Sequence, residues 1–163
     1  STRPGDIDPG AFLYLARNAG LTVDQLDEIL NHKSGLLGVS GSTGDMAELL
    51  QLEAAGDERA HLAVEMFCYR VRKYVGAYLA VLGGCKAVVF GGGIGERSPE
   101  IRRRICEPLA PLGLDFDPDR NHALGGEGCI SRDASAIEIW VVRTDEGRII
   151  ARDAYDVVMR GKD

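Results

Sequence analysis

Long hydrophobic runs and clusters of basic residues are both missing from this sequence, and each absence excludes a class of protein. No apolar run approaches the length of a membrane-spanning helix. The formal net charge is −6, and no block of lysine and arginine stands clear of acidic neighbours. The densest basic run, residues 102–104, falls in an expected helix and is interpreted as a solvated helix face. We therefore expect neither a membrane protein nor a nucleic-acid-binding surface.

Cysteine is also scarce, and its spacing gives no sign of a metal site. Cys68, Cys85, Cys106 and Cys129 are widely separated, and none has a second cysteine or a histidine at ligand spacing. The first residues show no basic and then apolar secretory leader. These features predict reduced cysteines, most of them in the core. We expect a soluble, cytoplasmic chain of one domain, because 163 residues are enough to bury a core.

A strand that runs into four glycines is the most informative feature that is present. Residues Ala87–Phe90 are apolar, as in a strand covered on both faces, and glycines stand at 91, 92, 93 and 95. Ser98 and Pro99 then suit the N-cap and the first position of a helix. A backbone without Cβ atoms can lie flat against a ligand, so this segment predicts an adenosine or phosphate contact.

Two common phosphate motifs do not match the glycine segment. No Gly-Lys-Ser/Thr follows to make a P-loop, and Glu96 stands where a dinucleotide fingerprint needs its third glycine. The alternative to a ligand contact is a tight strand-to-helix turn that binds nothing. The residues of this segment alone leave both interpretations open.

Hydrophobic spacing along the chain predicts alternating helices and strands, and therefore an α/β layer fold with a mostly parallel sheet. In such sheets ligands gather at the carboxyl ends of strands. Residues 40–45, 91–97 and 143–147 each follow an expected strand, so we expect a site where they meet. The expected strands are 36–40, 87–90 and 136–142, and the expected helices are 8–20, 22–32, one capped by Asp45, 58–82, one from Ser98, and 148–159.

Arg3 is a candidate anion-binding residue near the start of the chain. Pro4 and Gly5 restrict the backbone after it, and Asp6 or Asp8 could hold its guanidinium in one orientation. An arginine held in this way can direct the N–H donors of its planar guanidinium at a carboxylate or phosphoryl group. A cluster that only caps a helix would have the same composition, and this alternative remains open.

Glu146 is a candidate metal-binding residue, because it follows a buried strand and has Asp145 beside it. Acids at the end of a strand can hold Mg²⁺ through water near a nucleotide. An acid in the first turn of a helix also interacts favourably with the helix dipole, and that role is the alternative.

Five separated motifs agree in order and spacing with one family. The chain resembles the C-terminal part of acetate kinase over essentially all 163 residues. The resemblance implies a truncated C-terminal lobe of the acetate and sugar kinase, Hsp70 and actin (ribonuclease H-like) fold, helix-rich around a mostly parallel sheet. The motifs are residues 2–10, 33–41, 90–96, 144–146 and 149–153.

The family resemblance also implies an activity, cofactors and partners. Acetate kinases transfer the γ-phosphoryl group of ATP to acetate, reversibly, with Mg²⁺, and usually form dimers through the C-terminal lobe. By position, Arg3 matches a catalytic arginine that binds the carboxylate and stabilises the transferring phosphoryl group, and Glu146 matches the acid that positions Mg²⁺. The residues matching the nucleotide contacts are Asp45, Met46 and Ala47 in one segment, and Gly93, Ile94, Gly95, Glu96 and Arg97 in another.

The sequence departs from the family pattern at several of these positions. Arg97 replaces an asparagine, so a long cation stands where an amide is usual, which bears on nucleotide affinity or base preference. Met46 and Ala47 replace bulkier or basic residues. The remaining departures are Pro4 for serine, Gly91 for threonine, Asp145 for an uncharged amide and Gly147 for glutamate.

The N-terminal lobe of the family, with its phosphate loop and acid pocket, has no counterpart in these 163 residues. We therefore expect the nucleotide-binding and dimerisation part of an ATP:acetate phosphotransferase. A propionate or butyrate kinase is the alternative within the class. A natural truncated relative that only binds nucleotide or dimerises is the alternative outside it.

Overall fold

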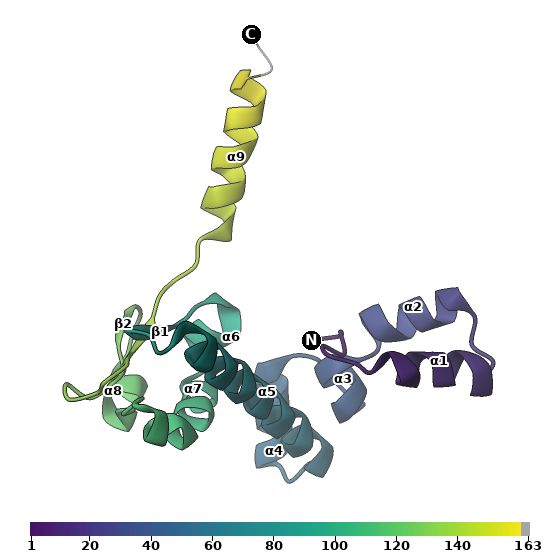
Figure 1. The fold of residues 1–163 in the computed structure, drawn as a ribbon, viewed down its shortest axis with the longest axis horizontal. Coiled ribbons are helices and arrows are strands. Elements are labelled where there is room, and N and C mark those ends of the chain that lie inside the picture. The colour runs from purple at the N-terminus through teal and green to yellow at the C-terminus, as the bar shows by residue number, and fades with distance from the viewer. Residues whose placement is uncertain (161–163) are drawn as a thin grey trace. The chain divides into compact units, whose positions relative to one another are not determined.

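The chain forms two compact units in a computed structural model, one of residues Ser1–Ala77 and one that begins at Tyr78. The structure describes residues 1–160, apart from the side chains of residues 146, 148, 149 and 160. Helices make up most of both units (Figure 1). Among the described residues, no helix combines the length and the apolar character that crossing a bilayer requires.

The first unit is helical, and its helices begin at caps that are visible in the sequence. Asp8 accepts a hydrogen bond from the Gly10 amide, and Thr22 forms a capping box with Gln25. Asp45 accepts from the amides of residues 47 and 48. The helices are α1 (Pro9–Asn18), α2 (Val23–His32), α3 (Gly35–Ser40), α4 (Met46–Ala54) and α5 (Glu58–Leu82), the last of which crosses the boundary between the units.

The strand expected at residues 36–40 is wrong, because this segment is the helix α3. The Gly38 amide donates to Ser34 O, and Gly41, at φ 72°, ends the helix in the left-handed region. A short apolar run does not distinguish a buried strand from a buried helical turn by its periodicity. Residues 40–45 therefore do not follow a strand.

The second unit contains a small mixed sheet with strand order β1-β3-β2 among the described residues. The predicted parallel pairing holds for β1 (Ala87–Phe90) and β3 (Glu138–Val141), but β2 (Gly128–Cys129) pairs antiparallel to β3. The helical elements of this unit are α6 (Gly92–Arg97), α7 (Pro99–Cys106), the 3₁₀ helix η1 (Glu107–Leu112), α8 (Pro118–Ala123) and α9 (Glu146–Arg160).

The register of the strands brings two of the three loops predicted to bind a ligand, residues 91–97 and 143–147, to one edge of this sheet. Phe90 pairs with Val141, and the Val142 amide donates to Phe90 O at 2.9 Å. Both parallel strands thus end together, and the glycine segment leaves the sheet beside residues 143–145. The buried side chains of this unit include Phe90, Ile101, Ile105, Cys106, Leu109, Leu114, Phe116, Ile130, Ile137, Ile139 and Val141.

The four cysteines are free thiols. Cys68 and Cys106 are buried, while Cys85 and Cys129 are partly exposed. Burial raises the pKa of Cys106 to about 12, so this thiol stays protonated at neutral pH. Cys106 therefore acts as a small core residue.

Candidate functional site

The glycine segment is helical from Gly92 onward, rather than an open turn that lasts until Ser98. Two of its glycines have structural reasons to be glycine. A Cβ at Gly91 would lie 2.9 Å from Thr144 Cγ2, and Gly92 has φ +72°. Gly93 has neither constraint, because a Cβ there would meet no atom within 4 Å and its φ is not positive. Residue 93 therefore borders open space that a ligand can occupy.

Hydrogen bonds to the Glu96 side chain connect the glycine segment to the residues that follow β3. Its Oε1 accepts hydrogen bonds from the Gly92 amide at 2.9 Å and from the Thr144 amide and hydroxyl, both at 2.8 Å. The Thr144 hydroxyl oxygen also accepts from the Gly92 amide at 3.1 Å. The Thr144 amide and hydroxyl, and then the Gly92 amide and Arg97, hold the pKa of Glu96 below its ordinary value of 4.5. The Glu96 carboxylate thus links the glycine segment to Thr144, which lies 48 positions after Glu96 in the sequence.

Acid should therefore release the glycine segment only below the ordinary pKa of a glutamate. Because the pKa of Glu96 is lowered in the folded chain, its hydrogen bonds stabilise the fold above pH 4.5 and are lost as pH falls through the lowered value. We expect the amide resonances of Gly92 and Thr144 to keep their shifts until pH is below 4.5 in an NMR titration. Glu96→Gln should remove this transition. A midpoint at or above 4.5 would contradict the assignment.

The interpretation of residues 102–104 as a solvated helix face is wrong for Arg102, which is 1% exposed. Its Nη1 donates to Gly95 O and Glu96 O, both at 2.8 Å, and its Nε donates to Asn121 Oδ1 at 2.7 Å. Arg103, by contrast, pairs with Glu100 and Glu107 at the surface. The sequence contains one indication that Arg102 is buried: it lies three positions before Ile105 and four before Cys106, on the apolar stripe of α7.

A cavity of about 580 Å³ opens beside the glycine segment within the second unit. Its volume is in the range of small-molecule sites. Arg97 and Arg143 are exposed, and guanidinium groups on a cavity wall suit an anionic or strongly polar ligand. The Arg143 amide donates to Glu127 Oε1 at 2.7 Å, which fixes the backbone there. The lining residues are Glu96, Arg97, Pro99, Arg102, Leu124, Gly125, Gly126 and Arg143.

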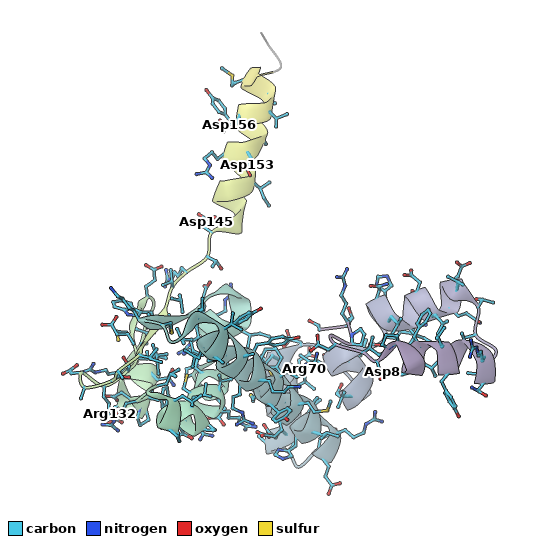
Figure 2. All side chains as sticks on the ribbon, in the orientation of Figure 1. Asp8, Arg70, Arg132, Asp145, Asp153 and Asp156 are labelled. Atoms are coloured by element: carbon cyan, nitrogen blue, oxygen red, sulfur yellow. The ribbon has the colours of Figure 1, made fainter. Side chains whose placement is uncertain are left out.

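Arg3 lies in the first unit and is exposed, but neither predicted carboxylate orients it. Asp6 accepts from the Tyr74 hydroxyl at 2.7 Å and forms an ion pair with Arg70 at 3.0 Å. Asp8 caps α1, whereas Arg70, the ion-pair partner of Asp6, lies on α5 (Figure 2). The expected orientation of Arg3 by Asp6 or Asp8 is therefore wrong: among the described residues, the hydrogen bonds and ion pairs of these two acids go to Tyr74, Arg70 and the Gly10 amide.

The segment that carries Arg3 is anchored by its backbone instead. The Ser34 amide donates to Thr2 O at 2.9 Å, and the Thr2 hydroxyl donates to Asn31 O at 2.8 Å. A Cβ at Gly35 would lie 2.7 Å from Arg3 O, so only glycine allows this approach. A Cβ at Gly44 would lie 3.0 Å from Ser1 Cβ. The segment before Arg3 therefore lies against the turn that leads into Asp45.

Asp45, Met46 and Ala47 form the first turn of α4 and its cap. Asp45 Oδ1 accepts from the Ala47 amide at 2.8 Å and from the Glu48 amide at 3.0 Å. Asp45 and Ala47 are exposed, whereas the side chain of Met46 is 5% exposed and belongs to the core. A ligand can therefore reach the cap and Ala47 more readily than the Met46 side chain.

Glu146 is the first residue of α9, and its side chain lies outside the described residues. Its neighbour Asp145 is exposed and marks the start of α9 in Figure 2. Among the side chains that are described, no group of three or more His, Cys, Asp and Glu residues could hold a metal. One carboxylate together with nucleotide phosphates is nevertheless an ordinary donor set for Mg²⁺.

Comparison with known proteins identifies the family. A family model described as the acetokinase family matches residues 1–152. The chain belongs to the acetokinase family. Acetate kinase of Chloroherpeton thalassium is 48% identical over 162 residues, which cover 98% of this chain and 39% of that protein. The chain thus spans about two fifths of the length of the curated acetate kinases it matches.

Solved structures of the family confirm the fold class. The crystal structure of Porphyromonas gingivalis acetate kinase matches with a TM-score of 0.89 at 41% identity, over 96% of this chain and 40% of that one. A propionate kinase from Francisella tularensis matches with a TM-score of 0.82 at 42% identity, over 89% and 37% of the two chains. This member of the acetokinase family therefore has the predicted lobe, helix-rich with a small mixed sheet.

Proposed function

We propose that this chain is the C-terminal, nucleotide-binding part of a cytoplasmic acetate kinase, an ATP:acetate phosphotransferase. One observation carries the proposal: in a member of this family, the glycine segment and residues 143–145 leave the sheet together and are joined through Glu96. The cavity beside them has the size and the polar lining for a nucleotide. Strand ends of this kind are where α/β folds bind their ligands.

The residues take roles that suit phosphoryl transfer, which depends on positioning and on charge neutralisation. Arg3, exposed on an anchored segment, binds the acid's carboxylate and neutralises charge on the moving phosphoryl group. Residues 93–97 contact adenosine, and residues 45–47 are the second segment that we propose as a nucleotide contact. Glu146 would hold Mg²⁺ directly or through water, and the ion would neutralise charge on the β- and γ-phosphates.

Acetate is the proposed acid, and propionate is the second candidate. The similarity to the Francisella tularensis propionate kinase favours that second candidate, although eight curated relatives at 41–48% identity are acetate kinases. A module that only binds nucleotide would not need Arg3 and Glu146, so their presence supports an enzyme.

The proposal includes a homodimer, supported by exposed apolar side chains along α5: Leu62, Met66, Tyr69, Tyr78, Val81 and Leu82.

An acyl hydroxamate assay on the full-length enzyme tests this proposal. We expect acyl phosphate from ATP and Mg²⁺, with the highest kcat/KM for acetate, and a large loss of activity in Arg3→Ala. A higher kcat/KM for propionate would select the second candidate. A protein that binds ATP but makes no acyl phosphate from acetate, propionate or butyrate would contradict the enzyme and favour a binding module.

A further inference from the structure

Arg102 is a buried cation whose described hydrogen bonds all go to neutral oxygens. It is 1% exposed and donates to the carbonyls of Gly95, Glu96 and Asn121 and to the Asn121 side chain. A buried charge is costly unless its donors are satisfied, and a guanidinium needs several acceptors in a fixed plane. Both conditions are met here by the backbone of α6 and by Asn121 of α8.

The two carbonyls on α6 are those that a short helix leaves open at its C-terminal end. The last four carbonyls of a helix have no partner within it, and in α6 these include the carbonyls of Gly95 and Glu96. Arg102 Nη1 bonds to both at 2.8 Å, and a cation at this end also suits the helix dipole. Arg102 thus caps α6 from the neighbouring helix α7.

Asn121 fixes the guanidinium from its other side. Asn121 is 3% exposed, accepts from Arg102 Nε at 2.7 Å and donates from Nδ2 to Pro99 O at 3.0 Å. Pro99 begins α7, so a single amide joins the start of α7, the Arg102 side chain and α8. Because hydrogen bonds hold the Arg102 guanidinium on two sides, it has one orientation. Its bonds to the α6 carbonyls then hold α6 in place as well.

We infer that Arg102, held by Asn121, is a positioning residue for the nucleotide. Arg102 keeps α6 in the orientation in which Glu96 and Arg97 line the cavity and the space beside Gly93 stays open. This inference rests on the proposed function, in which residues 93–97 contact adenosine. It assigns Arg102 no contact with the reacting atoms.

Arg102→Met in the full-length enzyme is the primary test. Without the guanidinium, two carbonyls at the end of α6 lose their donors and the segment loses its fixed orientation. We expect KM for ATP to rise about tenfold or more, while KM for acetate stays within about twofold and kcat falls only a few-fold. Arg102→Lys keeps the charge and some donors, and should recover part of the ATP affinity. Hydrogen exchange of the amides at residues 93–97 should accelerate in Arg102→Met.

Two variants of α7 separate positioning from stability. Ile105 is buried on the same helix, so Ile105→Ala should lower Tm and leave KM for ATP unchanged. Arg103 pairs at the surface, so Arg103→Met should change neither Tm nor KM appreciably. If Arg102→Met does not fold, Asn121→Ala removes the support of the guanidinium and should raise KM for ATP in the same selective way.

The outcomes distinguish this inference from the proposed function. An active enzyme in which Arg102→Met, or Asn121→Ala in its place, raises KM for ATP no more than Ile105→Ala would overturn the inference and leave the function standing. A wild-type enzyme that makes no acyl phosphate would overturn the function. In that case the amide hydrogen-exchange rates at residues 93–97 still decide whether Arg102 positions α6. Rates that are the same in Arg102→Met and in the wild-type protein would overturn that positioning role.

Discussion

Replacing Glu146 with alanine in the full-length enzyme should lower kcat by about 10²-fold, equivalent to about 2.7 kcal/mol of transition-state stabilisation. Glu146 stands two residues after Thr144, which is bonded to Glu96 and so to the glycine segment. Its carboxylate is our proposed anchor for Mg²⁺, and the metal matters most when charge develops on the phosphates. The loss should therefore fall on kcat, while Tm stays near the wild-type value.

Asp145→Ala is the matched control for Glu146→Ala. Asp145 is the adjacent acid, and the resemblance to acetate kinases places an uncharged amide at its position. Steady-state kinetics at several Mg²⁺ concentrations should show a much smaller change for Asp145→Ala. Near-normal turnover and Mg²⁺ dependence in Glu146→Ala, together with loss of both in Asp145→Ala, would move the metal role to the neighbouring residue.

Gly93→Val should raise the Kd for ATP about tenfold or more without unfolding the protein, since a few misplaced methyl groups in a pocket are worth about 1–3 kcal/mol. A Cβ at residue 93 meets no atom within 4 Å, and the residue does not have a positive φ. The added side chain therefore fits the free protein and fills the space assigned to adenosine. Calorimetric titration with ATP and a melting curve measure the two effects separately.

Gly76→Val supplies the control for Gly93→Val. Gly76 also lies in a helix, and a Cβ there meets no atom within 4 Å. Both variants should melt near the wild-type temperature, and only Gly93→Val should lose ATP affinity. Equal ATP affinity in the two variants would show that the glycine segment is a turn without a ligand, the alternative left open by the sequence.

Local chemistry explains which parts of the fold could be predicted. Capping at Thr22, Asp45 and Ser98 depends on residues within one helical turn, so the sequence displays it directly. The helix Glu58–Leu82 repeats its apolar residues over many turns, and its two ends were predicted as observed. The run at residues 36–40 is too short for such a pattern, and its helix was mistaken for a strand.

Long-range contacts explain what could not be predicted. β2 has two residues and exists only through its pairing with β3, so no local pattern marks it. The hydrogen bonds from the Thr144 amide and hydroxyl to Glu96 join segments that are 48 positions apart, and nothing at either segment alone indicates them. The burial of Arg102 was missed because its charge suggested solvent, whereas its position beside Ile105 on the buried stripe of α7 favoured the core.

A crystal structure of the full-length enzyme with ADP bound is the most direct test of the proposed nucleotide site. We predict adenosine against residues 93–97, beside the cavity lined by Glu96 and Arg97, with α6 still capped by Arg102. A nucleotide bound elsewhere, with the space beside Gly93 uncovered, would contradict the claim that this segment is the nucleotide site.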